Sequence, residues 1–208
     1  YDTVKVLGWL YAKQGQTASG EWSEYTKRGI KFLRRAVEKR GDDVEVRLEL
    51  AQLLETDSQR ENTEEAKEHY GAAMKVLKRR GIEVRPEILN NLAVLYHRLG
   101  MLEPRTNPRS KLFGRALQSL KQGLSAEEPG IANAFPTFFE QDGADEPTAA
   151  EAAAGGLEPT VSISPNQMTA AYNLGLVYES LSRWGKAKLI FRSIVKLMPG
   201  YVDAWLRL

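Results

Sequence analysis

Apolar residues recur along much of the chain at intervals of three and four, the spacing that places side chains on one face of an α-helix. The pattern is clearest near the end of the sequence, where Leu174 and Tyr178 fall in one helical stretch and Phe191 and Ile194 fall in a second. Pro199 is expected to end the second helix, because proline cannot donate the intrahelical hydrogen bond and clashes with the preceding turn. The pattern predicts an all-α fold of antiparallel helix pairs.

Small residues mark the places where paired helices are expected to approach closely, because a small side chain lets two helix axes come together. In the first helices of four successive pairs these residues are Gly8, Ala51, Ala93 and Gly175. The last pair has Leu174, Gly175, Tyr178, Ala187, Phe191 and Pro199 at the characteristic positions of the 34-residue tetratricopeptide repeat. The chain therefore resembles a tetratricopeptide-repeat solenoid. Trp205 and Leu208 follow Ala171 and Leu174 by 34 residues, so we expect the chain to break off inside the next repeat.

The earlier repeats are longer than the regular one. Their small residues are 43, 42 and 82 residues apart, against the 34 of the standard repeat. The excess coincides with Gly, Pro, Asn, Ser and Thr, which favours surface loops around residues 14–20 and at a turn through Pro104 and Pro108. Thr63, just before Glu64 and Glu65, is interpreted as the N-cap of a helix.

The largest insertion is acidic. Residues 122–166 hold eight Asp and Glu residues and no Lys or Arg, so the rest of a chain with net charge +2 carries +10. Because the segment is also rich in Gly and Pro and has a low-complexity stretch at 149–156, we expect it to be a disordered loop. The predicted organisation is three helix pairs in 1–121, the acidic loop in 122–166, and one regular repeat plus the first helix of the next in 167–208.

Composition argues against catalysis. The chain has no cysteine, which excludes disulfides, a thiolate nucleophile and a zinc–thiolate cluster. Its two histidines, His69 and His97, fall on different repeats at surface-type positions, and no phosphate-binding loop or metal-spaced acid cluster accompanies them. We therefore expect no enzyme activity, cofactor, metal or small-molecule substrate. No apolar run reaches membrane-spanning length and no signal peptide is visible, so an intracellular protein is expected.

The remaining expectation is binding of another macromolecule. In a tetratricopeptide solenoid the first helices line a groove, and here the residues predicted to bind a partner there are Lys5, Trp9, Asn90, Asn91, His97, Arg98, Tyr172, Asn173 and Glu179. Repeats of the chaperone-binding type hold a C-terminal carboxylate with Lys, Arg and Asn. This chain has Trp9, Glu49 and Glu87 at three of those positions, and the two carboxylates would repel such a ligand.

Two charged segments leave alternatives open. The basic stretch 27–40 has Ile30, Leu33, Ala36 and Val37 at helical spacing, which favours a solvated outer helix face over contact with phosphate or with an acidic protein. The same interpretation applies to residues 78–80.

In the acidic insertion, Phe135, Phe138 and Phe139 precede further acids, as in docking peptides, although these aromatics could equally cover a neighbouring repeat. Ser164 before Pro165 is a candidate for proline-directed phosphorylation.

Several longer stretches of the sequence resemble one protein family. Residues 1–8, 42–55, 86–100 and 201–208 resemble, in order, the tetratricopeptide scaffold subunit of the RNA polymerase II-associated factor (PAF) complex. The acidic insertion departs from this family.

The resemblance implies a nuclear, non-enzymatic scaffold that assembles subunits of a transcription elongation complex on RNA polymerase II and supports histone modification. It also implies that an extended segment of the complex's namesake subunit wraps the repeats. Two alternatives remain. One is direct nucleic-acid binding through the basic helices, which predicts affinity that falls steeply with salt. The other is a generic tetratricopeptide substrate adaptor.

Overall fold

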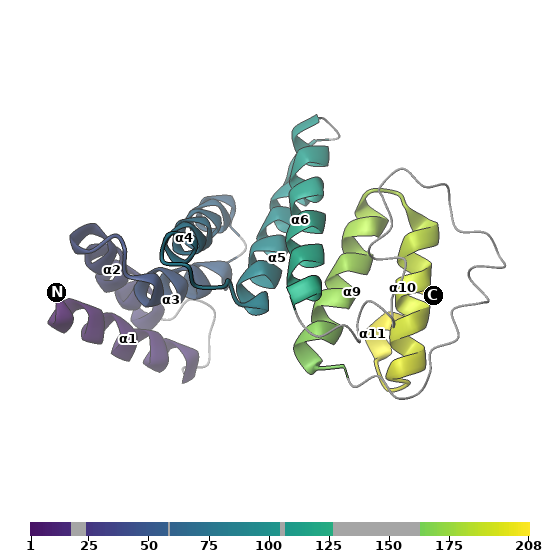
Figure 1. Ribbon diagram of the computed structural model, residues 1–208. Helices are drawn as coiled ribbons and strands as arrows, with labels where there is room; N and C mark the ends of the chain where they lie inside the picture. Colours follow the sequence, from purple (N-terminus) through teal and green to yellow (C-terminus); the bar gives the residue numbers. More distant parts are fainter. Residues whose placement is uncertain (18–23, 58, 105–106, 127–162) are drawn as a thin grey trace. The chain divides into compact units, whose positions relative to one another are not determined.

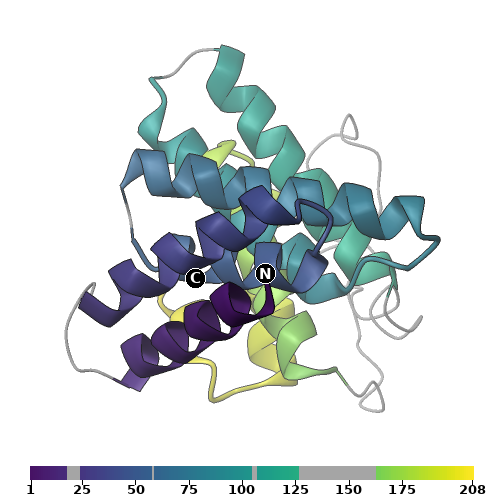
Figure 2. The same ribbon diagram turned by 90° about the vertical axis from the view of Figure 1, so that its left-hand side faces the viewer.

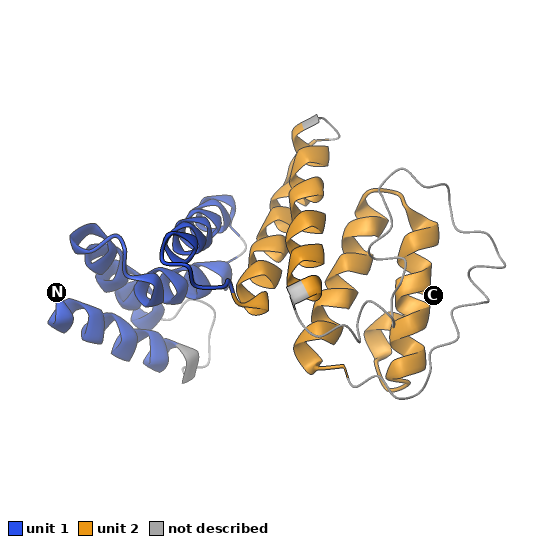
Figure 3. Ribbon diagram, in the orientation of Figure 1, with its two compact units in different colours: residues 1–84 blue, residues 85–208 orange. Residues whose placement is uncertain are grey.

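The computed structural model describes residues 1–17, 24–57, 59–104, 107–126 and 163–208, and the regular secondary structure in these ranges is α-helical (Figure 1). The helices gather into two compact units, Tyr1–Val84 and Arg85–Leu208 (Figure 3). The predicted all-α fold is confirmed. The third predicted helix pair belongs to the same unit as the fourth.

Unit 1 consists of two helix pairs. Its helices are α1 (Asp2–Thr17), α2 (Glu24–Lys39), α3 (Val44–Glu55) and α4 (Arg60–Arg79). α1 packs against α2 and α3 packs against α4, while α2 also contacts α3 (Figure 2). Each second helix buries one apolar stripe; in α2 it is formed by Ile30, Leu33 and Ala36. Burial of that stripe, at about 25 cal/mol per Å² of apolar surface, stabilises helices whose other faces are polar.

Unit 2 contains α5 (Pro86–Leu102), α6 (Asn107–Ala126), α9 (Pro165–Ser180), α10 (Trp184–Leu197) and the short α11 (Val202–Trp205). α5 pairs with α6 and α9 pairs with α10, while α9 also contacts both α5 and α6. One continuous core joins the two pairs, and its largest members include Phe113, Leu120, Tyr178 and Phe191. α10 ends at Leu197, two residues before Pro199, as predicted.

The predicted close helix crossings are present. A Cβ on Gly8 would lie 2.7 Å from Leu33 Cδ2, and one on Gly175 would lie 2.6 Å from Phe191 Cε1. Ala51 and Ala93 are buried almost completely. At Gly8 and Gly175 a small residue is therefore required by direct contact between the paired helices.

Two expectations for unit 1 are wrong. Residues 14–17 continue α1, because some of the extra residues in the first repeat lengthen this helix. Its last turns pack against α2, where Gly15 lies next to Thr26. Thr63 does not cap a helix. It is completely buried within α4, where its hydroxyl donates a hydrogen bond of 2.9 Å to the Gln59 carbonyl, and Gln59 occupies the N-cap position.

The boundaries of the acidic insertion also differ from the prediction. α6 continues through residues 122–126, because Leu117, Leu120 and Leu124 extend its apolar stripe, and it includes Pro108 in its first turn, where proline is tolerated. α9 begins at Pro165, with Ser164 as its N-cap in a capping box completed by Gln167. Residues 127–162 lie outside the described part of the chain, as do Phe135, Phe138 and Phe139.

No helix in the described ranges is long and apolar enough to span a membrane.

Candidate partner-binding surface

In unit 1 the predicted groove residues Lys5 and Trp9 lie on α1 and take part in an interhelical contact. The Lys5 ammonium is 2.9 Å from Asp43 and 3.2 Å from Glu45, and it lies 4.6 Å from the centre of the Trp9 ring. Asp43 also accepts hydrogen bonds from the Tyr1 hydroxyl and from the Val46 backbone N–H, the latter as the N-cap of α3. Lys5 is thus held by the start of α3.

This cluster perturbs the titration of its members. Burial alone would raise the pKa of Asp43, but hydrogen bonds from Lys5, Tyr1 and Val46 outweigh it and lower the pKa to about 2. Burial, reinforced by the Asp43 carboxylate, raises the pKa of Tyr1 to about 12. Asp43 therefore remains ionised and Tyr1 protonated across the physiological range, which keeps the contact between α1 and α3 intact.

In unit 2 the structure brings the predicted asparagines together across α5 and α9. Asn173 Nδ2 donates a hydrogen bond of 3.0 Å to Asn90 Oδ1, although the two residues are 83 positions apart. Nearby, Asn166 donates a 3.1 Å hydrogen bond to Glu87. A cavity of about 110 Å³ adjoins these side chains, and its lining includes Asn90, Asn91, Leu120, Leu124 and Gln167. α5, α6 and α9 thus form a polar hollow with an apolar floor.

The other predicted groove residues of unit 2 contact neighbouring helices. The His97 Nε2 atom lies 2.7 Å from Ser180 Oγ and its ring packs 5.5 Å from that of Phe113. Tyr172 packs against Phe191 and Tyr201, with ring centres 5.6 and 5.4 Å away. Glu179 forms an ion pair of 3.1 Å with Arg207, and Arg98 is half-buried.

The histidines are therefore not at surface positions. Burial lowers the pKa of His97, with a contribution from the positive charge of Arg109. His69 is half-buried between Arg47, 3.3 Å from its Nδ1, and Glu65, 3.5 Å from its Nε2, and burial lowers its pKa as well. The expectation failed because helical periodicity does not reveal which face meets the next repeat.

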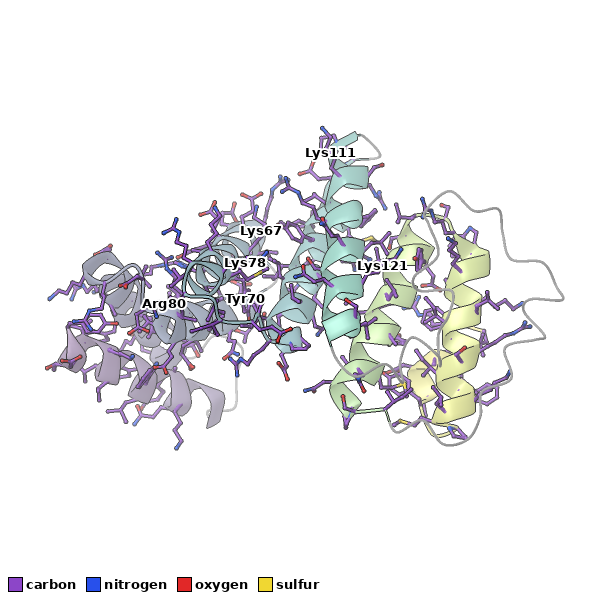
Figure 4. The ribbon with its side chains drawn as sticks, in the orientation of Figure 1. Lys67, Tyr70, Lys78, Arg80, Lys111 and Lys121 are labelled. Carbon is purple, nitrogen blue, oxygen red and sulfur yellow. The ribbon has the colours of Figure 1, made fainter. Side chains whose placement is uncertain are left out.

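The basic stretch of α2 is the solvated face of an amphipathic helix, as predicted. Its cations are exposed, but several pair with neighbours: Arg34 makes two hydrogen bonds of 2.8 and 2.6 Å to Glu65, and Arg28 lies 3.2 Å from Glu24. Arg80 lies just beyond the end of α4 (Figure 4). Its guanidinium is 3.0 Å from the Asp42 carboxylate. Much of the positive charge on this unit is neutralised locally.

A second hollow in unit 2 was not anticipated from the sequence. It measures about 630 Å³ and lies where α5 turns into α6 and α9 turns into α10, with Met101, Arg109, Phe113, Trp184 and Arg207 among its lining residues. Of the residues predicted for the partner groove, it contains Glu179 alone. One signal was available: α6 and α10 carry Lys and Arg but no Asp or Glu.

Comparison with known proteins places these features in context. No protein-family model matches the chain. Over its whole length the chain is 31% identical to the RNA polymerase-associated protein CTR9 of Caenorhabditis elegans. The chain resembles CTR9. It is also 25% identical over its whole length to the CTR9 homolog of Arabidopsis thaliana. The CTR9-like chain spans 15% and 17% of the lengths of these two relatives.

A solved structure supports the fold of the CTR9-like chain. The crystal structure of MamA protein matches all of this chain and 80% of its own with a TM-score of 0.60, at 12% sequence identity. This match and the adjacent helix pairs of the chain confirm the predicted fold class, an all-α tetratricopeptide-repeat solenoid. The resemblance to the scaffold subunit of the PAF complex, drawn from the sequence, is likewise confirmed. No cluster of three or more potential metal ligands occurs in the part of the chain that the structure describes.

Proposed function

We propose that the chain is a segment of a non-enzymatic scaffold that assembles subunits of an RNA polymerase II-associated complex in the nucleus and thereby supports transcription-coupled histone modification. The observation that carries the proposal is the similarity of the whole chain to CTR9, a protein named for its association with RNA polymerase. The tetratricopeptide fold supports it, because stacked helix pairs offer extended surfaces for other proteins.

For the binding mode, we propose that the α5 and α9 face of unit 2 holds an extended segment of a partner subunit, in the first instance the namesake subunit of the complex. The hydrogen bond between Asn90 and Asn173 uses one donor and one acceptor. Asn90 Nδ2 can still donate a hydrogen bond to a peptide C=O, and Asn173 Oδ1 can still accept one from a peptide N–H, since each amide side chain has further donor or acceptor capacity. The apolar floor at Leu120 and Leu124 can receive a side chain of the same segment.

Co-purification tests this proposal. A tagged chain is incubated with nuclear extract and its partners are identified by mass spectrometry, then compared with those of a variant carrying Asn90→Ala and Asn173→Ala. The expected result is loss of the PAF-complex subunits from the variant. Gln118→Ala is the matched control, because it removes an exposed amide from α6 outside the hollow. Unchanged recovery from a folded double variant would contradict the binding mode. Failure of the unmodified chain to recover any subunit of the complex would contradict the proposed function.

The nucleic-acid alternative is less well supported in unit 1, because the α2 cations Arg28 and Arg34 already contact carboxylates. Salt separates the two functions. A protein–protein complex held by amide hydrogen bonds and apolar contacts should persist between 50 and 200 mM salt, whereas binding through several phosphates should weaken by roughly a thousandfold or more over this range.

A further inference from the structure

The hollow at the turns of unit 2 is a second surface with the character of a protein-binding site. Residues from α5, α6, α9, α10 and the segment after α11 contribute to its lining. Its volume is about 630 Å³, larger than that of the hollow at Asn90. Since the two hollows share no lining residue, the use of one can be tested without altering the other.

Two large apolar side chains of this hollow are exposed. Trp184, in the first turn of α10, is 60% exposed, and Met101, near the end of α5, is 54% exposed. Among the described residues, no group accepts a hydrogen bond from the Trp184 indole N–H. Tryptophan and methionine are enriched in protein interfaces, where their burial supplies much of the binding free energy. A single apolar residue on a protein surface needs no functional explanation, but Trp184 lines a hollow together with Met101.

The charge of the hollow is positive. The Arg109 guanidinium lies 5.3 Å from the centre of the Phe113 ring and 3.9 Å from the Met101 sulfur. Within the described ranges it forms no ion pair with a carboxylate. Among the described residues that line the hollow, Glu179 is the one carboxylate, and Arg207 already holds it at 3.1 Å. Because burial and Arg109 both lower the pKa of His97, this neighbouring imidazole stays neutral near pH 7 and the positive charge resides on the arginines.

Two of the helices that contribute to the hollow are themselves basic. α6 and α10 together carry eight Lys and Arg residues and no Asp or Glu. Lys188 and Arg192 lie four residues apart on α10 and are exposed. Like charges at this spacing destabilise a helix by a few tenths of a kcal/mol per pair. A negatively charged partner removes this repulsion, so charge complementarity identifies the occupant as acidic.

We infer that the hollow bounded by Met101, Arg109 and Trp184 is a docking site for an acidic protein segment with an aromatic or aliphatic anchor. A carboxylate of the segment pairs with Arg109, where a planar guanidinium can form two parallel hydrogen bonds. The apolar side chain of the segment covers Trp184 and Met101. The exposed tryptophan favours a protein segment over a structureless polyanion, since a purely electrostatic partner leaves this apolar surface uncovered.

Fluorescence anisotropy with a synthetic peptide tests the inference. The probe is fluorescein-labelled Asp-Glu-Phe-Asp-Glu-Leu, titrated with the full 208-residue chain at 100 mM salt. Arg109→Glu and Trp184→Ala are each expected to weaken binding about tenfold or more. The matched controls are Lys111→Glu, which reverses an exposed charge two residues away on α6 and outside the hollow (Figure 4), and Trp205→Ala, which removes a 54% exposed tryptophan outside the hollow. Each control is expected to change affinity by less than about threefold.

Several results would overturn the inference. One is equal weakening by Arg109→Glu and Lys111→Glu, which would indicate diffuse attraction to the whole basic surface. Another is equally tight binding of a probe in which Ala replaces Phe and Leu, because it would exclude the apolar anchor. A third is stronger binding by oligouridylate than by the peptide, with no response to Trp184→Ala, which would assign the surface to nucleic acid. Circular dichroism of each variant shows that a loss of binding does not reflect unfolding.

Discussion

The two units have the same helix-pair architecture but are held together differently. Unit 1 has 16 Lys and Arg against 15 Asp and Glu, and ion pairs join its helices and the segments between them, as in the contacts Lys5–Asp43, Arg34–Glu65 and Arg80–Asp42. In unit 2, residues 85–126 and 163–208 carry 13 Lys and Arg against four Asp and Glu. Within these ranges Arg207 forms an ion pair of 3.1 Å with Glu179. Unit 1 therefore pairs many of its cations with its own carboxylates, whereas residues 85–126 and 163–208 carry nine more cations than carboxylates.

The helices of unit 2 are held together mainly by packing of aromatic and aliphatic side chains. Phe113, Tyr178 and Phe191 are each at most 1% exposed and belong to one core shared by α6, α9 and α10. A large aromatic side chain contributes several kcal/mol when it is fully buried. Packing of this kind can stabilise a unit without a network of ion pairs between its helices.

The largest expected effect comes from removing an aromatic side chain from that core. Phe191→Ala leaves a cavity against Gly175 and Tyr172, and we expect it to lower the free energy of unfolding of unit 2 by about 4 kcal/mol. Urea denaturation followed by circular dichroism measures the loss, and hydrogen exchange assigns it to a unit. Trp184→Ala is the matched control on the same helix, because its 60% exposed ring should contribute less than about 1 kcal/mol. Equal effects of the two substitutions would contradict the aromatic-core account of unit 2.

A smaller effect is expected from crowding a helix crossing in unit 1. Gly8→Val places a branched side chain where a Cβ alone would lie 2.7 Å from Leu33 Cδ2, and should lower the free energy of unfolding by about 2 kcal/mol. Thermal denaturation checks this value. Gly71→Ala is the control in which the added methyl group meets no neighbouring group. Its Cβ in α4 has open space within 4 Å, so the higher helix propensity of alanine should stabilise the unit by up to about 1 kcal/mol. A neutral Gly8→Val would show that α1 and α2 can separate there without penalty.

The Asp43 contact gives a pH-dependent test of the ion-pair account. Since the pKa of Asp43 is lowered to about 2, its stabilising contribution is complete above the unfolded-state pKa near 4 and is lost as pH falls through 2. We expect Asp43→Ala to lower the free energy of unfolding by about 2 kcal/mol at pH 7, and by progressively less as the pH falls from 4 to 2. Asp43→Asn retains a good helix cap and should recover the part due to capping. A pH-independent difference between Asp43→Ala and the unmodified chain would exclude the ion pair as its cause.

The sequence predicted the features that depend on local spacing. The contact between Gly175 and Phe191 could be predicted because both residues belong to one regular repeat. Pro199 likewise predicted where α10 ends. The end of α6 cannot be predicted from charge, because the helix follows its leucine stripe beyond the start of the acidic segment. The role of Thr63 cannot be predicted from sequence, because a hydroxyl before two glutamates fits either an N-cap or the first turn of a helix.

The candidate site was less predictable for a different reason. Asn90 contacts Asn173, and His97 contacts Ser180. The residues of each pair are 83 positions apart, and the insertion between them has a length that the repeat pattern does not predict. The hollow at Arg109 and Trp184 combines residues from several helices that meet only in the folded unit. Composition gave one usable signal, the absence of acids from α6 and α10, but it does not indicate where on those helices a partner binds.

The smallest expected effect tests whether the surface ion pairs of unit 1 contribute to its stability at all. Arg34 bonds both oxygens of Glu65, but its side chain is 46% exposed, so solvent screens the pair. We expect Arg34→Gln to lower the free energy of unfolding by about 0.5 kcal/mol at low salt, with the difference disappearing in 1 M NaCl. Arg35→Gln is the matched control, because it removes a neighbouring exposed cation for which the structure shows no carboxylate contact in the described ranges. If Arg35→Gln destabilised the unit as much as Arg34→Gln, the effect would come from net charge, and the contrast between the units would rest on the partly buried Asp43 cluster alone.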